Sequence, residues 1–440
     1  MKFYNRTKEI AELQRIKKLS FSEYSRMTVI TGRRRIGKTS LIMKSVENEP
    51  NVYLFVGRKT EARLCNEYIQ EISNALNVFV PQEISSFRSL FQYLMEIGKQ
   101  RSFHLIIDEF QEFFNINESI YSDIQNLWDQ YRRKTKVNLI VSGSVYSLMN
   151  KIFQNSKEPL FGRADNTIKL SPFDTDTLKT IIYDYNPDYQ NDDLLALYTF
   201  TGGIPKYVEL ICDGCELKVE SMIEFIVREN SPFIDEGKNL LIEEFGKNYG
   251  TYFSILSCIS GGINTQPTIM TALNEKSIGG HIKRLIEDYN ILKRVRPFGA
   301  KEGSQTARYE IIDNFLQFWF NYFDRNRSMI ELKAFSGLQE IVKSDYTTYS
   351  GKMLERYFRA KLAETGLYRE IASWWEPKGE ANEIDIVALL FEKNKALAVE
   401  VKRNKERFHP KIFAEKVKRL KQLELPKFTI ETGCLSLEDM

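Results

Sequence analysis

One eight-residue segment, Gly32-Arg-Arg-Arg-Ile-Gly37-Lys38-Thr39, constrains this chain more than any other. It follows the apolar run 27–31 and precedes a stretch with helical spacing, so a tight loop would connect a strand to the start of a helix. Two glycines let the backbone curl until its N–H groups point inward, and the helix N-terminus adds about half a positive charge. The lysine and the threonine add an ammonium group and a hydroxyl. The segment therefore predicts a loop that binds the phosphates of a nucleotide.

The nucleotide would contact the whole loop and the first residues of the helix. Lys38 would reach the β- and γ-phosphates, and Thr39 would place its hydroxyl on Mg²⁺. A chance glycine-rich turn is the alternative, but strand, loop and helix follow one another in the order that the motif requires. We therefore predict that Mg-ATP is held by Gly32, Arg33, Arg34, Arg35, Ile36, Gly37, Lys38, Thr39 and Ser40.

A second apolar run, Leu105-Ile-Ile-Asp108-Glu109, ends in two carboxylates. Ligands of open α/β sheets bind beyond the carboxyl ends of the strands, where Asp108 would lie. Asp108 is predicted to hold Mg²⁺ through water, and Glu109 to polarise the attacking water as a catalytic residue. For an acidic strand end taken alone, a helix cap is the alternative. The next strand ends at Ser142-Gly-Ser144, which predicts either a γ-phosphate sensor or a simple turn.

The first 173 residues alternate short apolar runs with stretches of helical spacing. Continuous apolar strands between helices are typical of a parallel sheet that is covered on both faces. Residues 1–173 are therefore predicted to form a three-layer α/β domain around the loop, with residues 119–133 as one of its helices. Its predicted strands are 27–31, 52–56, 105–108, 137–142 and 167–170.

Two further regions follow this domain. Residues 174–245 have helical patterns, which predicts a small helical lid. In residues 246–325, two or three short helices precede the strands 291–295 and 307–312, the order of a winged helix-turn-helix. The aromatic stretch 315–323 predicts a helix buried between domains.

The last section, residues 345–440, returns to an α/β pattern and holds a candidate metal site. Glu400 and Lys402 would point to one face of a strand, and Asp385 would lie opposite Lys402, within a residue or two, on the partner strand. Two carboxylates could bind Mg²⁺ or Mn²⁺, and the lysine could orient or deprotonate a water, as phosphodiester cleavage requires. An alternating solvated face with an Asp–Lys pair is the alternative. The predicted elements are a helix at 351–365, strands at 384–391 and 396–402, and a helix at 410–423.

Basic residues gather around the predicted hairpin and in the tail, although the net charge is only +3. Clustered cations are the expected footprint of phosphate binding, so nucleic acid, DNA more than RNA, is the predicted partner. A solvated helix face is the alternative for such clusters. The residues concerned are Lys276, His281, Lys283, Arg284, Lys293, Arg294 and Arg296, followed by Lys402, Arg403, Lys405, Arg407, Lys411, Lys416, Lys418, Arg419 and Lys421.

Cysteine usage and hydropathy bear on the cellular compartment. Five scattered cysteines do not suggest a disulfide framework and indicate a reducing compartment. No apolar run approaches the roughly 18 residues of a membrane-spanning helix. We therefore expect a cytoplasmic protein that does not contact membranes.

These motifs resemble those of the archaeal-type ATPases, a P-loop group that is AAA+-like and related to the STAND ATPases. The resemblance implies that Asn5 and Arg6 lie near the adenine and that Pro205 contacts the nucleotide from the lid. It also implies that Arg163 is an arginine finger or sensor, in the same or a neighbouring subunit of a homo-oligomer that forms with ATP. A surface salt bridge is the alternative for Arg163. The matching segments are Phe3-x-x-Arg6, Gly32 to Thr39, Ile107 to Phe110, Val141 to Ser144, Leu160 to Arg163, Ser171 to Phe173 and Gly202 to Pro205.

The C-terminal section is similar to the PD-(D/E)XK nuclease fold, that of restriction endonucleases, which archaeal-type ATPases commonly carry. Glu355, on the preceding helix, resembles the first-helix glutamate of that fold. Ile384 stands where the fold usually has proline. Together the patterns predict an ATPase that drives a switch or motor on nucleic acid, with a metal-dependent nuclease tail. The alternative is a signalling or scaffold ATPase whose nucleotide state controls protein assembly and whose tail is inactive.

Overall fold

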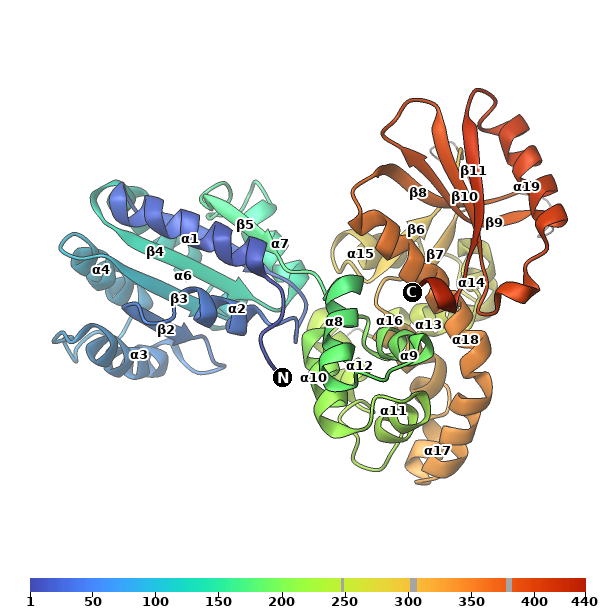
Figure 1. Ribbon diagram of the computed structural model, residues 1–440. Helices are drawn as coiled ribbons and strands as arrows, with labels where there is room; N and C mark the ends of the chain where they lie inside the picture. Colours follow the sequence, from blue (N-terminus) through green and yellow to red (C-terminus); the bar gives the residue numbers. More distant parts are fainter. Residues whose placement is uncertain (247–248, 301–306, 377–381) are drawn as a thin grey trace. The chain divides into compact units, whose positions relative to one another are not determined.

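The computed structural model describes residues 1–246, 249–300, 307–376 and 382–440. The chain forms two compact units. One unit is Asn5–Ser171, and the other joins Met1–Tyr4 to Pro172–Met440 (Figure 1). None of the described helices is long and apolar enough to cross a bilayer.

The Asn5–Ser171 unit is built on a five-stranded parallel sheet, as its apolar runs predict. The strands are β1 (Arg26–Thr31), β2 (Asn51–Phe55), β3 (Phe103–Asp108), β4 (Val137–Gly143) and β5 (Asn166–Lys169). Their order in the sheet is β2-β3-β4-β1-β5, and every neighbouring pair is parallel. All residues of β3 and β4 are buried, which explains why these strands are apolar throughout instead of alternating.

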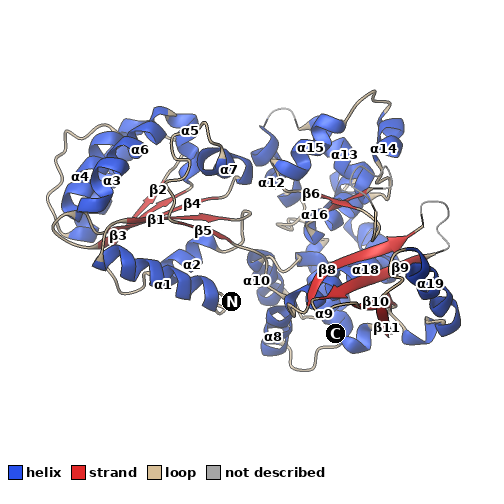
Figure 2. Ribbon diagram, turned by 90° about the horizontal axis from the view of Figure 1, so that it is seen from above, coloured by secondary structure: helices blue, strands red, loops and turns tan. Residues whose placement is uncertain are grey.

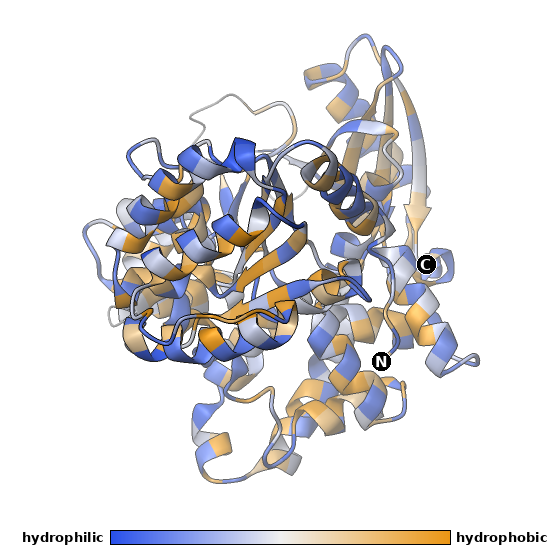
Figure 3. Ribbon diagram, turned by 90° about the vertical axis from the view of Figure 1, so that its left-hand side faces the viewer, coloured by the Kyte–Doolittle hydropathy of each residue, from blue (hydrophilic) through white to orange (hydrophobic). Residues whose placement is uncertain are grey.

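Helices cover both faces of this sheet and make the unit three layers thick (Figure 2). Helices α1 and α2 lie on one face, and α3, α4, α6 and α7 bury most of the core against the other. Figure 3 shows the strands of this unit coloured mainly as hydrophobic. The helices are α1 (Thr7–Ser22), α2 (Lys38–Ser45), α3 (Glu61–Leu76), α4 (Phe87–Gly98), α5 (Phe113–Ile116), α6 (Ser119–Tyr131) and α7 (Tyr146–Gln154).

The second unit begins with a helical region to which the chain's N-terminus is attached. The Met1 ammonium group lies 3.5 Å from the Asp213 carboxylate, and the Tyr4 hydroxyl donates to Asp184 at 2.8 Å. The helices are α8 (Thr175–Tyr185), α9 (Asn191–Thr201), α10 (Pro205–Gly214), α11 (Val219–Ile226) and α12 (Glu236–Phe245).

Three helices and an antiparallel strand pair follow, in the order that the sequence predicts. They are α13 (Gly250–Ser260), α14 (Gln266–Leu273), α15 (Gly279–Glu287), β6 (Leu292–Val295) and β7 (Arg308–Ile311). Their assignment as a winged helix-turn-helix stays a prediction. The segment after β6 packs on the C-terminal sheet, because Phe298 is buried with Trp374 and its N–H donates to the Ser373 carbonyl at 2.8 Å.

The C-terminal part departs from prediction in three elements. The helix expected at 351–365 begins at Phe335 and runs through 30 residues, and strands β8 and β11 were not predicted. The sheet has the order β11-β10-β9-β8, with α19 on one face and α18 in contact with β8, β9 and β10. The elements are α16 (Asn314–Phe318), the π-helical η4 (Trp319–Asp324), α17 (Arg327–Glu331), α18 (Phe335–Glu364), β8 (Tyr368–Trp375), β9 (Glu383–Leu390), β10 (Lys395–Val401), α19 (Pro410–Leu423) and β11 (Thr429–Leu435).

Candidate nucleotide site and C-terminal carboxylates

The loop from Gly32 to Thr39 connects β1 to α2, as the motif requires. Gly37 takes a left-handed backbone with φ of 86° as the N-cap of α2, which a residue with a Cβ adopts only at a cost. Gly37 has no side chain with which to cap α2, and the first amides of a helix are a favourable binding place for an anion. Arg35 is also left-handed, with φ of 69°. Such strain, about 1–2 kcal/mol per residue, is typical of ligand-binding segments.

Lys38 lies in the concave side of the loop. Its ammonium group donates to the Gly32 carbonyl at 3.0 Å and to the Arg33 carbonyl at 3.2 Å, and the residue is only 6% exposed. A buried ammonium group needs such acceptors, because leaving it unpaired would cost several kcal/mol. The Lys38 ammonium group is therefore held in place within the loop, beside the start of α2.

The carboxylate of Asp108 is the centre of a hydrogen-bond network at the carboxyl end of β3. Thr39 Oγ1 and Tyr53 Oη each donate to Asp108 Oδ2 at 2.8 Å. Ser142 Oγ and the Glu109 N–H donate to Oδ1. The two residues predicted to share Mg²⁺, Thr39 and Asp108, are therefore in direct contact, and Ser142 joins them from the neighbouring strand.

Tyr53 is a member of this network that the sequence did not point to. It lies on β2, beside Ile106 of β3, so its side chain reaches the end of the neighbouring strand. Burial raises the pKa of Tyr53, and the nearby Asp108 carboxylate raises it further. The phenol therefore stays protonated and donates a hydrogen bond to Asp108.

Glu109 has both carboxylate oxygens held by donors. Ser144 Oγ donates to Oε1 at 2.7 Å, and Gln111 Nε2 donates to Oε2 at 2.6 Å. The backbone of Glu109 is left-handed, with φ of 54°, which directs its side chain differently from that of Asp108. Gln111 is 1% exposed and was not predicted as a site residue. The sequence of this turn, Phe110-Gln-Glu-Phe113, carries no signal that distinguishes Gln111 from its polar neighbour Glu112.

Asn5 and Arg6 lie at the start of α1, and both have left-handed backbones. Arg6 is 7% exposed, and its guanidinium group donates to the Ser171 carbonyl at 2.7 Å and to the Ile36 carbonyl at 3.5 Å. It also pairs with Glu9 at 3.2 Å. Arg6 thus contacts the phosphate loop itself, while the predicted adenine contact of Asn5 and Arg6 stays a prediction.

The resemblance also selected Arg163 and Pro205 as residues that act on the nucleotide. Arg163 pairs with Asp129 at 3.2 Å and donates to the Phe161 carbonyl at 2.9 Å, which is the salt bridge considered as its alternative role. Pro205 is the first residue of α10, in the second unit, and its contact with nucleotide stays a prediction.

Of the three carboxylates predicted to form the C-terminal metal site, Asp385 lies beside Glu400 and close enough to Glu355 to affect its pKa. Asp385 lies one residue beyond the Ile386–Val399 pair of the β9–β10 ladder, beside Glu400, and its Oδ2 accepts from the Val401 N–H at 2.7 Å. Burial raises the pKa of Glu355 to about 7, and the Asp385 carboxylate adds to this effect. Burial also raises the pKa of Asp385. Both shifts are those of carboxylates that share a poorly solvated space.

Cations already hold two of these carboxylates. Lys402 Nζ lies 2.9 Å from Glu400 Oε1, with Lys416 at 3.7 Å, and Arg359 lies 3.3 Å from Glu355. Within the residues that the structure describes, no three His, Cys, Asp or Glu side chains are grouped to hold a metal ion. Glu400 would have to leave Lys402 to complete a site with Glu355 and Asp385.

Several of the basic residues proposed to contact nucleic acid are paired within the chain. Such pairs reduce the positive field that these residues would present to phosphates. The pairs are Lys283–Glu287 (3.7 Å), Lys293–Glu310 (3.0 Å), Arg403–Asp192 (2.7 Å) and Arg419–Glu376 (2.7 Å).

Comparisons with known proteins agree with the nucleotide site. Residues 3–211 match a family described as "ATPase domain predominantly from Archaea", and residues 319–414 match "Archaea bacterial proteins of unknown function". An uncharacterized protein of Methanocaldococcus jannaschii is 29% identical over 437 residues, 97% of this chain and 93% of that protein. The Walker-type ATPase of Pyrococcus abyssi has the same fold, with a TM-score of 0.54 at 18% identity over 72% of this chain and 96% of its own. Residues 3–211, which contain the loop at residues 32–39, therefore match an ATPase domain found predominantly in Archaea.

Proposed function

We propose that this chain is an ATP-hydrolysing switch that acts on nucleic acid. The observation that carries the proposal is the hydrogen bond from Thr39 Oγ1 to Asp108 Oδ2, 2.8 Å long, beside the N-terminus of α2. A hydroxyl and a carboxylate so placed are the pair that P-loop ATPases use for Mg²⁺. When bound with ATP, Mg²⁺ would neutralise charge on the β- and γ-phosphates.

Different residues of the site would bind the phosphates, activate the water and sense the γ-phosphate. The α2 amides and Lys38 would bind the phosphates, replacing the contacts that Lys38 now makes to loop carbonyls. Glu109 would orient a water and accept its proton, because Ser144 and Gln111 hold its carboxylate in one position. Ser142, bonded to Asp108, would sense the γ-phosphate.

The contacts of Arg163 do not favour the catalytic role that the resemblance implies for it. Its ion pair with Asp129 favours a structural role within one chain over the role of an arginine finger. Arg163→Ala separates the two roles. Loss of a finger would lower kcat by about a thousandfold or more, whereas loss of an exposed ion pair would change stability by about 1 kcal/mol at most. A fall in kcat together with loss of ATP-dependent oligomers would establish the finger.

The C-terminal part would supply the contact with nucleic acid. In the nuclease form of the proposal, Glu355, Asp385 and Glu400 would hold Mg²⁺ or Mn²⁺, and Lys402 would orient a water. That water would attack phosphorus as the bond to the leaving oxygen breaks. In the alternative, the chain is a scaffold ATPase whose C-terminal domain is an inactive binding platform. The ion pairs of Glu355 and Glu400 would then stay intact and no metal ion would be bound.

The test combines ATP turnover with binding and cleavage of DNA. Action on nucleic acid predicts salt-sensitive DNA binding and an ATPase rate that DNA changes. The nuclease form further predicts Mg²⁺- or Mn²⁺-dependent nicking that is lost in Asp385→Ala and kept in Glu392→Ala, which removes an exposed carboxylate paired with Lys395. ATP hydrolysis and ATP-dependent oligomers without any affinity for nucleic acid would contradict the proposal and favour the scaffold ATPase.

A further inference from the structure

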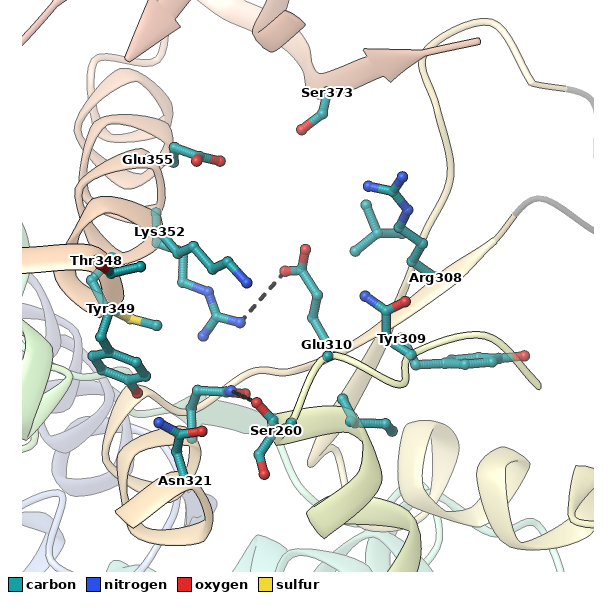
Figure 4. Close-up of a pocket in the computed structure, with 18 of the residues that line it drawn as sticks. Ser260, Arg308, Tyr309, Glu310, Asn321, Thr348, Tyr349, Lys352, Glu355 and Ser373 are labelled. Atoms are coloured by element: carbon teal, nitrogen blue, oxygen red, sulfur yellow. Dashed lines mark hydrogen bonds and ion pairs between the residues drawn. The ribbon is translucent and has the colours of Figure 1, made fainter. Parts of the chain in front are cut away.

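A cavity of about 760 Å³ lies within the second unit, between β7, the η4 segment, α18 and the edge of the C-terminal sheet. Figure 4 shows Lys352 and Glu355 entering it from α18, Arg308 and Glu310 from β7, and Ser373 from the sheet side. Its size is that of cavities which bind a ligand as large as a nucleotide. Part of its wall is π-helical (Trp319–Asp324), a geometry often found at functional sites.

Positive charge in this cavity is only partly neutralised. Arg308 pairs with Glu383 at 3.2 Å and covers the Trp375 ring at 4.4 Å, and Arg356 lies 3.6 Å from Glu310. Arg325 and Lys352 also line the cavity, and within the described residues neither has a carboxylate within ion-pair distance. Both side chains are exposed. Two cations are therefore available to an anionic ligand.

Buried polar groups that line the cavity lack partners. Tyr349 is 8% exposed, and its hydroxyl makes no hydrogen bond with the described residues. The same holds for Nε of Arg359, whose Nη2 donates to the Asp385 carbonyl at 2.9 Å. A buried hydroxyl without a partner is uncommon and costs free energy, so such groups commonly mark the place of a ligand or an ordered water.

The candidate carboxylate site opens into the same cavity. Glu355 and Asp385 both line it, and so do Arg325 and Lys352. A ligand that reached the two carboxylates would therefore share the cavity with two cations that have no ion-pair partner among the described residues. Phosphate-binding cations together with carboxylates that can take a divalent ion suit a phosphodiester chain.

The hairpin limits which form of nucleic acid can enter. The described residues that follow β6 pack on the C-terminal sheet through Phe298, so this part of the predicted hairpin is held against the protein. A B-form duplex presents a major groove about 12 Å wide and is far larger than this cavity. An unpaired strand or a strand end can enter a pocket of this kind, as flipped or single-stranded nucleotides do.

We propose that this cavity binds an unpaired strand of nucleic acid, with its phosphates on Arg325 and Lys352 and one phosphodiester beside Glu355 and Asp385. The inference rests on the proposed action on nucleic acid and specifies its substrate as a strand end or an unpaired segment. The Tyr349 hydroxyl would donate to the bound strand.

The test measures binding of a labelled oligonucleotide by fluorescence anisotropy over a range of salt concentrations, with EDTA present so that no strand is cut. Three probes are compared: an unpaired oligonucleotide, a blunt duplex of the same sequence and free AMP. The double variant Arg325→Gln/Lys352→Gln is compared with Lys393→Gln/Lys427→Gln, which removes the same charge from exposed positions outside both the cavity lining and the basic residues predicted to contact nucleic acid.

We expect the wild-type chain to bind the unpaired strand more tightly than the duplex or AMP. The cavity variant should bind it at least tenfold more weakly and lower the slope of log K against log salt by about 1.4, since each phosphate contact with a single strand contributes about 0.7. Tyr349→Phe should also weaken binding of the strand without lowering the thermal midpoint, because its hydroxyl makes no hydrogen bond with the described residues that the variant would lose. This second variant keeps the test valid if the double variant folds poorly.

Two results would overturn the inference and can be told apart. Unchanged affinity in the cavity variant and in Tyr349→Phe, with wild-type binding intact, would reject the cavity and leave the action on nucleic acid standing. A wild-type chain that hydrolyses ATP but binds none of the nucleic-acid probes would reject the proposed function and this inference with it.

Discussion

Replacing Glu109 with glutamine tests the catalytic role assigned to its carboxylate. In the folded chain that carboxylate accepts from Ser144 Oγ at 2.7 Å and from Gln111 Nε2 at 2.6 Å. A glutamine side chain has the same shape and can keep its carbonyl oxygen on Gln111, while the Ser144 hydroxyl rotates to accept from the new amide. Since both contacts can be kept, we expect the free energy of unfolding to change by at most about 1 kcal/mol.

The effect on turnover should be much larger than the effect on stability. An amide cannot accept a proton from the attacking water, and a positioned general base contributes about 10²–10⁴-fold to rate. This corresponds to about 3–5 kcal/mol of the barrier at 1.36 kcal/mol for each tenfold change. ATP affinity should hardly change, because Lys38 and the α2 amides are untouched. Glu109→Gln should therefore bind ATP like the wild type and turn it over at least about a hundredfold more slowly.

Steady-state hydrolysis, nucleotide titration calorimetry and thermal unfolding would be measured on the same preparations. The matched control is Glu112→Gln, which changes another carboxylate of the same segment, 8% exposed and 3.2 Å from Arg58. We expect its kcat to remain near that of the wild type. Normal turnover in Glu109→Gln, or an equal fall in both variants, would refute the assignment of Glu109 as the base.

Three further predictions follow from the contacts. Lys38→Ala should weaken ATP binding by about 10- to 100-fold in calorimetry, since a charge-assisted hydrogen bond is worth about 1.5–3 kcal/mol; unchanged affinity would exclude a phosphate contact. Gly203→Ala should lower the unfolding free energy by about 1–3 kcal/mol, because φ is +75° and a Cβ would lie 2.6 Å from the Phe173 carbonyl. Gly162→Ala, with φ of +70° and open space, should cost less in the same denaturant titration. Burial lowers the pKa of His104, so below about pH 6.5 the unfolded chain takes up a proton that the folded chain does not. Unfolding free energy should then fall as pH drops from 7 to 5, and His104→Gln should flatten that dependence; an equal slope in both would contradict it.

Much of the nucleotide site could be predicted because its residues are neighbours in the sequence. Gly37, Lys38 and Thr39 are fixed by one loop, and Asp108 by the end of one apolar strand. A parallel sheet brings the carboxyl ends of its strands to one edge, so the contact of Thr39 with Asp108 follows from the strand order. Tyr53 and Gln111 could not be found in this way, because nothing near them in sequence indicates that they reach these carboxylates.

The C-terminal part was harder to predict because its contacts are distant in sequence. The long helix α18 has apolar residues on no single face over its whole length, since it contacts helices α8, α9, α11 and α17 as well as the sheet. Its start at Phe335 was therefore missed. Strand β11 is mostly exposed or half-buried, with Glu431 and Gly433 in it, so its sequence carries little of the apolar pattern of the other strands.

The sequence by itself determined the three-layer ATPase domain and the chemistry of its loop. Both depend on local features, namely glycines that curl the backbone, apolar strands and carboxylates at strand ends. Only the tertiary structure decided which charges remain available. Glu400 and Lys293 are held in ion pairs. Among the described residues, Arg325 and Lys352 have no ion-pair partner and the Tyr349 hydroxyl has no hydrogen-bond partner, and all three line one cavity. The physical reason is that an electrostatic partner is chosen by distance in space, which the chain's fold sets and its local pattern does not.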